Sequence, residues 1–400
     1  MDIAVVNGKI AEIGKDLPAG KSQVISSKNL HVSVGWLDIG THIGEPGLEH
    51  RETTKSLCSA ALAGGYTDLA PFATSVPSIQ TKAQVTAIVN DAAVHGVSLH
   101  PIGALSVDRK GENIAEYLDM AAAGVTAYSD GLRAVQKSGL LLRALQYSKA
   151  SKALVIHHPT DHTLDNDAQI HEGDVSIKMG MKGSPSMAEH VMVDRDISLQ
   201  QYTDARLCLY GISSKDSVDR IKKAKAKTTD IYSTVPYLNL LLTDTDLLDF
   251  DTNLKVSPVL RSTADRSALV RAVKAGIIDC LVSNHVPLEP EAKQVEFPYA
   301  KTGATGLETL YAAVNTNLGD QLPLIDLITI LTVNSRKMLG TPIPALIKDA
   351  PAKLTCWDPT IEWTYDGSSR KSRSQNNPFL DKLLVGRVVA CINGDKAYTL

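Results

Sequence analysis

Two segments of the sequence carry side chains that can bind a metal ion. His42 follows one apolar run, and a second apolar run leads into His157-His158-Pro159-Thr160-Asp161-His162. Imidazole nitrogens and carboxylate oxygens are common zinc ligands. His158 and His162 are four residues apart, which suits one metal ion only in a helix, whereas Pro159 favours a loop. The residues alone leave open whether these are exposed loop histidines or a new metal site formed by His42, His157, His158, Asp161 and His162.

Cysteine thiolates do not offer an alternative metal site. The cysteines are far apart, and none belongs to the Cys-x-x-Cys pair that is typical of thiolate zinc sites. Their odd number and wide separation also argue against a disulfide framework, so we expect reduced and mostly packed thiols. The five cysteines are Cys58, Cys208, Cys280, Cys356 and Cys391.

The composition is that of an ordinary globular protein. Of the 400 residues, 44% are hydrophobic and 21% are charged, which excludes a disordered or collagen-like chain. The formal net charge is −3 without a long run of one sign, so we expect no binding to nucleic acid or to an anionic membrane. No apolar stretch is long enough to span a membrane, and the first residues lack the pattern of a signal peptide. These features predict a cytoplasmic protein.

The segments between the candidate residues alternate between strand and helix patterns. From about residue 31 to 340, short apolar or β-branched runs alternate with segments of helical period, which is typical of βα units around a parallel sheet. Eight such repeats predict a closed (β/α)₈ TIM barrel, whose reactive side chains lie at the C-terminal ends of the strands. The predicted strands cover residues 32–39, 66–72, 97–103, 125–129, 153–158, 206–212, 229–235 and 277–283.

The two ends of the chain depart from this alternation. The N-terminal part contains the hairpin signal Asn7-Gly8, and the C-terminal part contains short alternating strands with turn residues. We therefore predict an α/β protein in which residues 35–340 form the barrel. Residues 1–34 and 341–400 together form a small composite β domain, a β-sandwich built from both termini. The polar, basic segment 368–378 is predicted to be a solvated loop.

Several motifs carry a resemblance to a known family. The end of the first predicted strand, residues 38–47, resembles the D-x-H-x-H-x-R-E-P-G pattern of the dihydroorotases in the amidohydrolase superfamily. Similar segments follow in the same order along nearly the whole chain, at residues 47–67, 178–199, 254–287, 302–309 and 372–379.

The resemblance implies both a fold and a reaction. The fold is a TIM barrel of the amidohydrolase type with a small composite β domain. The reaction is the reversible hydrolysis of the cyclic amide of dihydroorotate to carbamoyl aspartate. In such a site, one or two zinc ions bind the attacking water, and an aspartate accepts its proton.

The positions of the family's metal ligands are largely altered in this chain. The two histidines of the first motif fall on Gly40 and His42, so one imidazole is lost. The family's aspartate pair is reduced to Asp130, which is either a ligand or a turn residue. A further histidine falls on His158 and is retained, whereas the next falls on Gly211 and is lost. The resemblance therefore implies that no intact binuclear metal site remains.

The positions of the proton acceptor and the substrate-binding residues are altered as well. The family's general base falls on Asn284, and an amide has no pKa near neutrality with which to accept a proton. The carboxylate-binding arginine falls on a glycine, which removes a bidentate charged hydrogen bond. The altered substrate-binding positions are Gly44, Thr74, Ser257 and Leu288.

These residues are compatible with three functions. The combined loss of metal ligands, general base and substrate-binding residues favours the first. In the first, the chain is a non-catalytic, metal-poor dihydroorotase-like protein of pyrimidine biosynthesis. For such proteins the resemblance implies aspartate carbamoyltransferase as a partner, in a homodimer or mixed oligomer. In the second, the new histidine cluster binds a metal ion for another cyclic amide or imide. In the third, a weak zinc-dependent dihydroorotase uses His42, His158 and Asp130.

Overall fold

The eight barrel strands lie where the sequence predicts strands. The structure is a computed structural model that describes residues 1–20 and 22–400, so position 21 of the predicted small domain lies outside the described residues. Neighbouring barrel strands that share a sheet run parallel. The strands are β4 (Trp36–His42), β5 (Tyr66–Phe72), β6 (Ser98–Leu99), β7 (Ala127–Tyr128), β8 (Leu154–His157), β11 (Leu207–Leu209), β12 (Ile231–Pro236) and β13 (Cys280–Val282).

Hydrogen bonds join these strands into a ring. One sheet has the order β4-β5-β6, and the other has the order β13-β12-β11-β8-β7. A parallel bridge between Gly103 and Tyr128 connects the two sheets on one side. On the other side, the backbone N–H of His42 donates to the carbonyl oxygen of His285 at 2.9 Å. The predicted (β/α)₈ TIM barrel is therefore confirmed.

Apolar side chains fill the inside of the ring. Residues two apart along a strand point to the same side, and Leu37 and Ile39 of β4 both belong to one buried cluster with residues from the other strands. Met338 and Leu339 of α13 (Ser335–Leu339) belong to the same cluster. The barrel interior is thus a packed core, as is usual for this fold.

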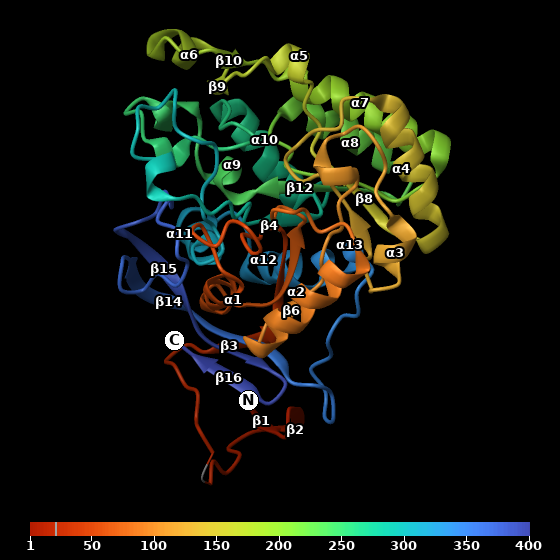
Figure 1. Cartoon of the computed structure of the whole chain (residues 1–400). Coiled ribbons are helices and arrows are strands. Elements are labelled where there is room, and N and C mark those ends of the chain that lie inside the picture. The colour runs from red at the N-terminus through yellow and green to blue at the C-terminus, as the bar shows by residue number, and fades with distance from the viewer. Residues whose placement is uncertain (21) are drawn as a thin grey trace.

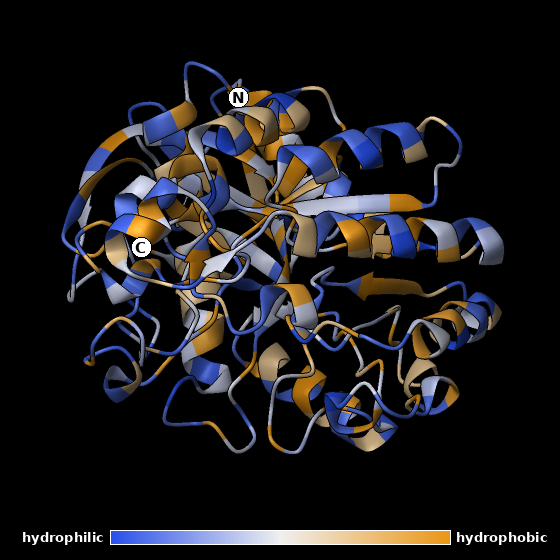
Figure 2. Ribbon diagram, turned by 90° about the horizontal axis from the view of Figure 1, so that it is seen from above, coloured by the Kyte–Doolittle hydropathy of each residue, from blue (hydrophilic) through white to orange (hydrophobic). Residues whose placement is uncertain are grey.

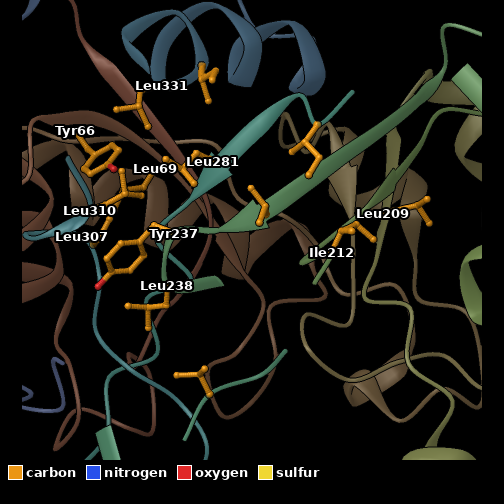
Figure 3. Packing of buried hydrophobic residues seen from close by; sticks show 14 of the residues in the cluster. Tyr66, Leu69, Leu209, Ile212, Tyr237, Leu238, Leu281, Leu307, Leu310 and Leu331 are labelled. Carbon is orange, nitrogen blue, oxygen red and sulfur yellow. The ribbon is translucent and has the colours of Figure 1, made fainter. Parts of the chain in front are cut away.

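Helices cover the outside of the strands (Figure 1). Apolar and polar residues alternate along these helices, whereas apolar segments gather toward the centre of the molecule (Figure 2). Figure 3 shows part of the layer between strands and helices, where Leu69 of β5, Leu281 of β13 and Leu331 are packed. The main helices are α1 (Thr54–Ala63), α2 (Lys82–Val94), α3 (Tyr117–Ala121), α4 (Ser138–Ser151), α7 (Met187–Thr203), α8 (Lys215–Lys225), α9 (Tyr237–Leu241), α10 (Thr263–Lys274), α11 (Leu310–Leu318) and α12 (Leu324–Thr329).

Helix α1 shows why such segments form where they do. Thr53 and Ser56 exchange hydrogen bonds in a capping box at its start, and the backbone turns out of the helix at Gly64. Leu57, Ala60 and Ala61 of this helix are buried. Within the described part of the chain, no helix combines the length and the apolar character that crossing a bilayer requires.

A short excursion interrupts the barrel between β8 and α7. It contains α5 (His162–Asp165), β9 (Ile170–His171), α6 (Asp174–Met179) and β10 (Gly183–Ser184), and it lies at the top of the view in Figure 1. The buried guanidinium of Arg261 anchors the excursion, because it donates to the Ser184 carbonyl oxygen at 3.2 Å and to Ser213 Oγ at 2.7 Å.

Strands from both ends of the chain form the antiparallel part of the molecule. One sheet has the order β16-β15-β14-β3, and β1 and β2 form a separate hairpin. Ile10, Ala352 and Leu354 form a small apolar core there. The division at residues 34 and 341 stays a prediction. The strands are β1 (Asp2–Val6), β2 (Lys9–Gly14), β3 (His31–Val34), β14 (Lys353–Tyr365), β15 (Lys382–Asn393) and β16 (Lys396–Thr399).

The predicted first strand, residues 32–39, is in fact two strands. Residues up to Val34 belong to β3 and pair with β14, whereas β4 begins at Trp36 and pairs with β5. Gly35 lies between them, and its N–H donates to the carbonyl oxygen of Lys353 at 2.9 Å. The apolar pattern is continuous because both halves are packed, so periodicity alone does not reveal the break.

Candidate functional site

The C-terminal ends of the barrel strands bring part of the predicted site together. His158 follows β8, and its Nε2 lies 3.4 Å from the hydroxyl of Ser257. Asn284 follows β13, and its Nδ2 donates to the carbonyl oxygen of Ser257 at 2.9 Å. These residues meet at the mouth of the barrel, where the fold family places its chemistry.

His158 is held as a neutral imidazole. Its Nδ1 lies 3.0 Å from the carbonyl oxygen of Tyr210, to which it donates, so that Nε2 carries the free lone pair. Burial lowers its pKa. The hydroxyl oxygens of Thr160 and Ser257 lie 3.3 and 3.4 Å from Nε2. The nitrogen that would bind a metal ion is therefore faced by two hydroxyl groups.

His42 lies at the end of β4 and is neutral as well. Burial, followed by the charge of Arg109, lowers the pKa of His42 to about 3. Its ring packs edge-on against Phe72, with the ring centroids 6.1 Å apart. His42 Nε2 is buried, and within residues 1–20 and 22–400 no group forms a hydrogen bond with it. This nitrogen is therefore a ligand-type atom of the predicted site that protein groups leave unused among the described residues.

Tyr210 occupies the space beside Gly40. A Cβ atom placed on Gly40 would lie 2.3 Å from Tyr210 Oη and 2.5 Å from Cζ, and the backbone φ of Gly40 is +87°. Tyr210 is fully buried, and its hydroxyl donates to the carbonyl oxygen of Ile39 at 3.3 Å. A side chain at position 40 is therefore excluded both by its neighbour and by the backbone conformation.

Sequence reasoning did not identify Tyr210 as a residue of the site. A weak signal was present, because this large aromatic residue directly precedes Gly211, another position at which a ligand is lost. The sequence does not show that the ring crosses the barrel to reach Gly40.

Gly44 and Gly211 are also enclosed. A Cβ atom on Gly44 would lie 2.3 Å from the carbonyl oxygen of Glu52 and 2.9 Å from that of Leu48. Both neighbours are backbone atoms, so even alanine requires the turn to move. Gly211 has a φ of +74°, and its Cβ position lies 3.3 Å from Nδ1 of His158. The family's arginine and histidine do not fit these positions in the present backbone.

Asp130 serves a structural purpose. Its carboxylate accepts the backbone N–H groups of Leu105 at 3.1 Å and Ser106 at 2.9 Å, and it also accepts the Ser106 hydroxyl. Burial raises its pKa. Asp130 therefore ties the loop after β6 to the end of β7, which corresponds to the turn-residue alternative.

The remaining substrate-binding positions have structural partners too. Thr74 Oγ1 accepts the backbone N–H of Ile43 at 2.9 Å, which joins the loops after β4 and β5. Leu288 is buried in an apolar cluster with Val286 and Ala292. Asn284 is buried with a φ of +47°, and within the described residues its Oδ1 has no hydrogen-bond partner.

Apolar side chains pack beside these residues. Phe72 and Tyr210 pack edge-on with ring centroids 5.0 Å apart, and both belong to the interior core. Leu132 packs against this core and also against the cluster that contains Leu288. A hydrolase of this class needs room for a bound water and a polar substrate, whereas these contacts extend the core to the surface loops.

The alternative histidine cluster is not assembled. Both ring nitrogens of His157 are engaged, Nδ1 with Asp196 at 2.6 Å and Nε2 with the N–H of Val135 at 2.8 Å. Asp161 caps α5 by accepting the N–H of Thr163 at 2.8 Å. In the part of the chain that the structure describes, no three His, Cys, Asp or Glu side chains are arranged to hold a metal ion. The residues present thus fit neither this cluster nor the zinc site implied by the family.

The segment 368–378 is a loop, as predicted, but it is only partly solvated. Lys371 and Arg373 are exposed, whereas Ser372, Ser374, Asn376 and Asn377 are buried. Asn376 Nδ2 donates to the carbonyl oxygen of Val286 at 2.9 Å. The buried half differs from the prediction because its polar groups find partners on the barrel loops, among them the carboxylates of Glu52 and Glu308.

Comparisons with known proteins identify the family to which the chain is related. Residues 31–217 match the Dihydro-orotase-like family. A dihydroorotase from Pelotomaculum thermopropionicum is 36% identical over 397 residues, which is 99% of this chain and 93% of that protein. A dihydroorotase from Acetivibrio thermocellus is 36% identical over 400 residues, covering 99% of this chain and 94% of the relative.

Solved structures of hydantoinases share the fold. L-hydantoinase (dihydropyrimidinase) from Arthrobacter aurescens superposes with a TM-score of 0.84 at 22% identity, covering 100% of this chain and 93% of that chain. D-hydantoinase (dihydropyrimidinase) from Thermus sp. has a TM-score of 0.80 at 19% identity, covering 99% and 91%. At such identities the likeness concerns the fold alone. The sequence relatives, matched over almost their full length, place this chain in the dihydroorotase-like family.

Proposed function

We propose that this dihydroorotase-like protein does not catalyse the reaction of its family and acts in pyrimidine biosynthesis as a structural or regulatory subunit. One observation carries the proposal of inactivity: Tyr210 fills the space beside Gly40 in which the first family histidine would lie. A ligand lost by simple substitution leaves a vacant pocket. Here the space is part of the barrel core.

The position of the proton acceptor supports the same proposal. Hydrolysis of a cyclic amide requires a group that takes a proton from the attacking water and delivers one to the leaving nitrogen. Asn284 stands at that position, and its Nδ2 donates to the Ser257 carbonyl oxygen at 2.9 Å. An amide does not accept a proton near neutral pH, so this step has no base there.

Substrate binding lacks its charged contact as well. Dihydroorotate carries a carboxylate, and the family's arginine position is Gly44, over which the backbone closes. Leu288 places an apolar side chain where the last family histidine would contact substrate. Loss of a bidentate guanidinium contact removes one of the stronger hydrogen-bonding arrangements available to a carboxylate.

The names of the relatives favour a second candidate, an active or weakly active zinc-dependent dihydroorotase. Turnover should therefore be measured in both directions, with and without added zinc ions, for the wild type and for Asn284→Asp. We expect no turnover from either, because groups that act as a unit are not restored singly. If the wild type turns over substrate and His158→Ala abolishes this turnover, the second candidate is established instead.

The proposed partner is aspartate carbamoyltransferase, and this step rests on the family resemblance. The two chains, co-expressed from the same organism, should elute together in size-exclusion chromatography at a mass above that of either alone. The transferase should also be more stable or more active in the complex. Separate elution at micromolar concentrations, with transferase activity unchanged, would contradict the proposed partnership and leave the assignment of the fold intact.

A further inference from the structure

Two lysine side chains are buried side by side in loops that follow the barrel strands β12 and β13. Lys255 follows the short helix η3 (Thr252–Leu254), and Lys293 follows η4 (Pro290–Ala292). Their exposed fractions are 6% and 7%. Within the described residues, neither ammonium group lies within 4.0 Å of a carboxylate oxygen. Buried lysines without an ion-pair partner are unusual, because burial disfavours the charged form.

The hydrogen bonds of the two lysines differ. Lys255 Nζ donates to Gln169 Oε1 at 3.2 Å and to the carbonyl oxygens of Phe297 and Pro298 at 2.9 Å each, which uses all three of its protons. Lys293 Nζ donates to the carbonyl oxygen of Thr252 at 2.7 Å and makes only a long contact of 3.4 Å with that of Lys255. The set of acceptors around Lys293 therefore suits a neutral amine better than an ammonium group.

The charges around Lys293 act in the same direction. Burial and the positive charge of Lys255 lower the pKa of Lys293 to about 7, and the carboxylate of Asp251 opposes this shift. About half of the Lys293 side chains are then neutral at pH 7. An ordinary lysine, with a pKa of about 10.4, is neutral in fewer than about one molecule in a thousand at that pH.

Lys293 borders the surface. It lines a depression of about 670 Å³ together with Phe250, Asp251, Thr252, Gln294, Val295 and Glu296. Phe250 and Val295 are exposed apolar side chains, so part of the wall of this depression is apolar. The carboxylates of Asp251 and Glu296 favour a neutral reagent over an anionic one at this place.

We propose that Lys293 is an acylation site, at which the amine accepts a small acyl group from an activated carboxylic donor. The lone pair of Nζ attacks the carbonyl carbon and forms an amide bond. The bond from that carbon to the leaving group breaks, and the leaving group departs with the electron pair. One proton of Nζ passes to the thiolate of a thioester donor, or to solvent when phosphate leaves. The amide keeps one N–H for the Thr252 carbonyl oxygen.

Mass spectrometry of acetylated peptides tests this proposal on the intact chain. One sample receives the neutral thioester S-acetyl-N-acetylcysteamine, and the other receives acetyl phosphate, at several pH values between 6 and 9. Lys223 of α8 is exposed and serves as the internal reference. At pH 7 we expect Lys293 to be acetylated at least about tenfold faster than Lys223, and more strongly by the thioester than by acetyl phosphate.

The pH profile and two variants separate an acyl acceptor from a purely structural lysine. Above pH 7 the rate at Lys293 should level off, whereas the rate at Lys223 should continue to rise about tenfold per pH unit. Asp251→Asn removes the charge that raises the pKa of Lys293, so the midpoint of the profile should move to lower pH. Lys293→Arg should remove the modified peptide. A rate at Lys293 equal to or below that at Lys223 at pH 7 with both donors, or a profile without a plateau up to pH 9, would overturn the proposal.

Discussion

The surroundings of Asp68 in strand β5 and the mouth of the barrel differ in how their buried polar groups are paired. Asp68 of β5 is buried, and three groups surround its carboxylate at 2.8 Å each: the guanidinium of Arg336, the ammonium of Lys353 and the ring of His100. At the mouth, atoms of His42 and Asn284 are buried without a hydrogen-bond partner among the described residues. The carboxylate of Asp68 is fully paired, whereas these atoms at the mouth are not.

The pairing around Asp68 holds separate parts of the fold together. Lys353 belongs to β14 of the antiparallel sheet, Arg336 belongs to α13, and Asp68 belongs to the barrel. Burial alone would raise the pKa of the Asp68 carboxyl, but the hydrogen bond from His100 and the charges of Lys353 and Arg336 hold it well below its usual range. These interactions favour the charged form in the folded state.

The contrast shows which polar groups the fold itself requires. The unpaired atoms at the mouth lie at positions where the resemblance predicts a ligand and the general base, and the fold persists without partners for them. The charged groups around Asp68 each pair with its carboxylate. The scaffold therefore depends on a set of buried groups that is distinct from the predicted site.

Replacement of Asp68 should have the largest effect on stability. Asp68→Asn leaves the buried Arg336 and the partly buried Lys353 without a matching carboxylate. Breaking a buried ion pair from one side typically costs about 3–5 kcal/mol. Chemical unfolding in urea should show this loss relative to the wild type. A loss below about 1 kcal/mol would mean that the polar cluster is not essential for stability, and the contrast with the mouth would disappear.

Gly40→Ala should have the next largest effect, because the new Cβ atom meets Tyr210 at a positive φ. Overpacking typically costs about 1–3 kcal/mol, and backbone strain of this type adds about 1–3 kcal/mol. Tyr210→Ala alone should also destabilise the core. The double variant should lose at least about 1 kcal/mol less unfolding free energy than the sum of the losses in the two single variants, since the steric conflict is gone. Strict additivity would show that the two residues do not compete for the same space.

The pH dependence of stability should identify the contribution of Asp68. Because its pKa is lowered in the folded state, its stabilising effect is fully present above the unfolded value of about 4. The effect is lost as the pH falls below that value toward the folded pKa, and each unit of depression corresponds to about 1.4 kcal/mol. The difference in unfolding free energy between wild type and Asp68→Asn should therefore shrink between pH 5 and pH 2. A constant difference over this range would mean that the charge of Asp68 is not the stabilising feature.

Ser257→Ala at the mouth should have the smallest effect. The Ser257 hydroxyl makes only a long contact of 3.4 Å with His158 Nε2, and the hydrogen bond from Asn284 reaches the Ser257 backbone, which the substitution keeps. The change in unfolding free energy should stay within about 0.5 kcal/mol. A loss above about 1.5 kcal/mol would show that the polar groups of the mouth are as strongly coupled as those around Asp68.

Local patterns were sufficient for the order of the elements. Alternating apolar runs and helical periods placed all eight barrel strands. The assignment of positions 40, 44, 211 and 284 to altered family positions follows from the resemblance of the surrounding motifs, and it stays a prediction. These features depend only on neighbours within a few residues along the chain.

The tertiary structure decided what the altered positions became. The contact of Tyr210 with Gly40, the burial of the polar segment 368–378 and the enclosure of Lys293 beside Lys255 each join residues that lie far apart in the sequence. Periodicity and composition indicate which face of a segment is buried. They do not specify which distant segment packs against that face. At this barrel mouth, the distant neighbour determines whether a position without a large side chain is a pocket or part of a packed core.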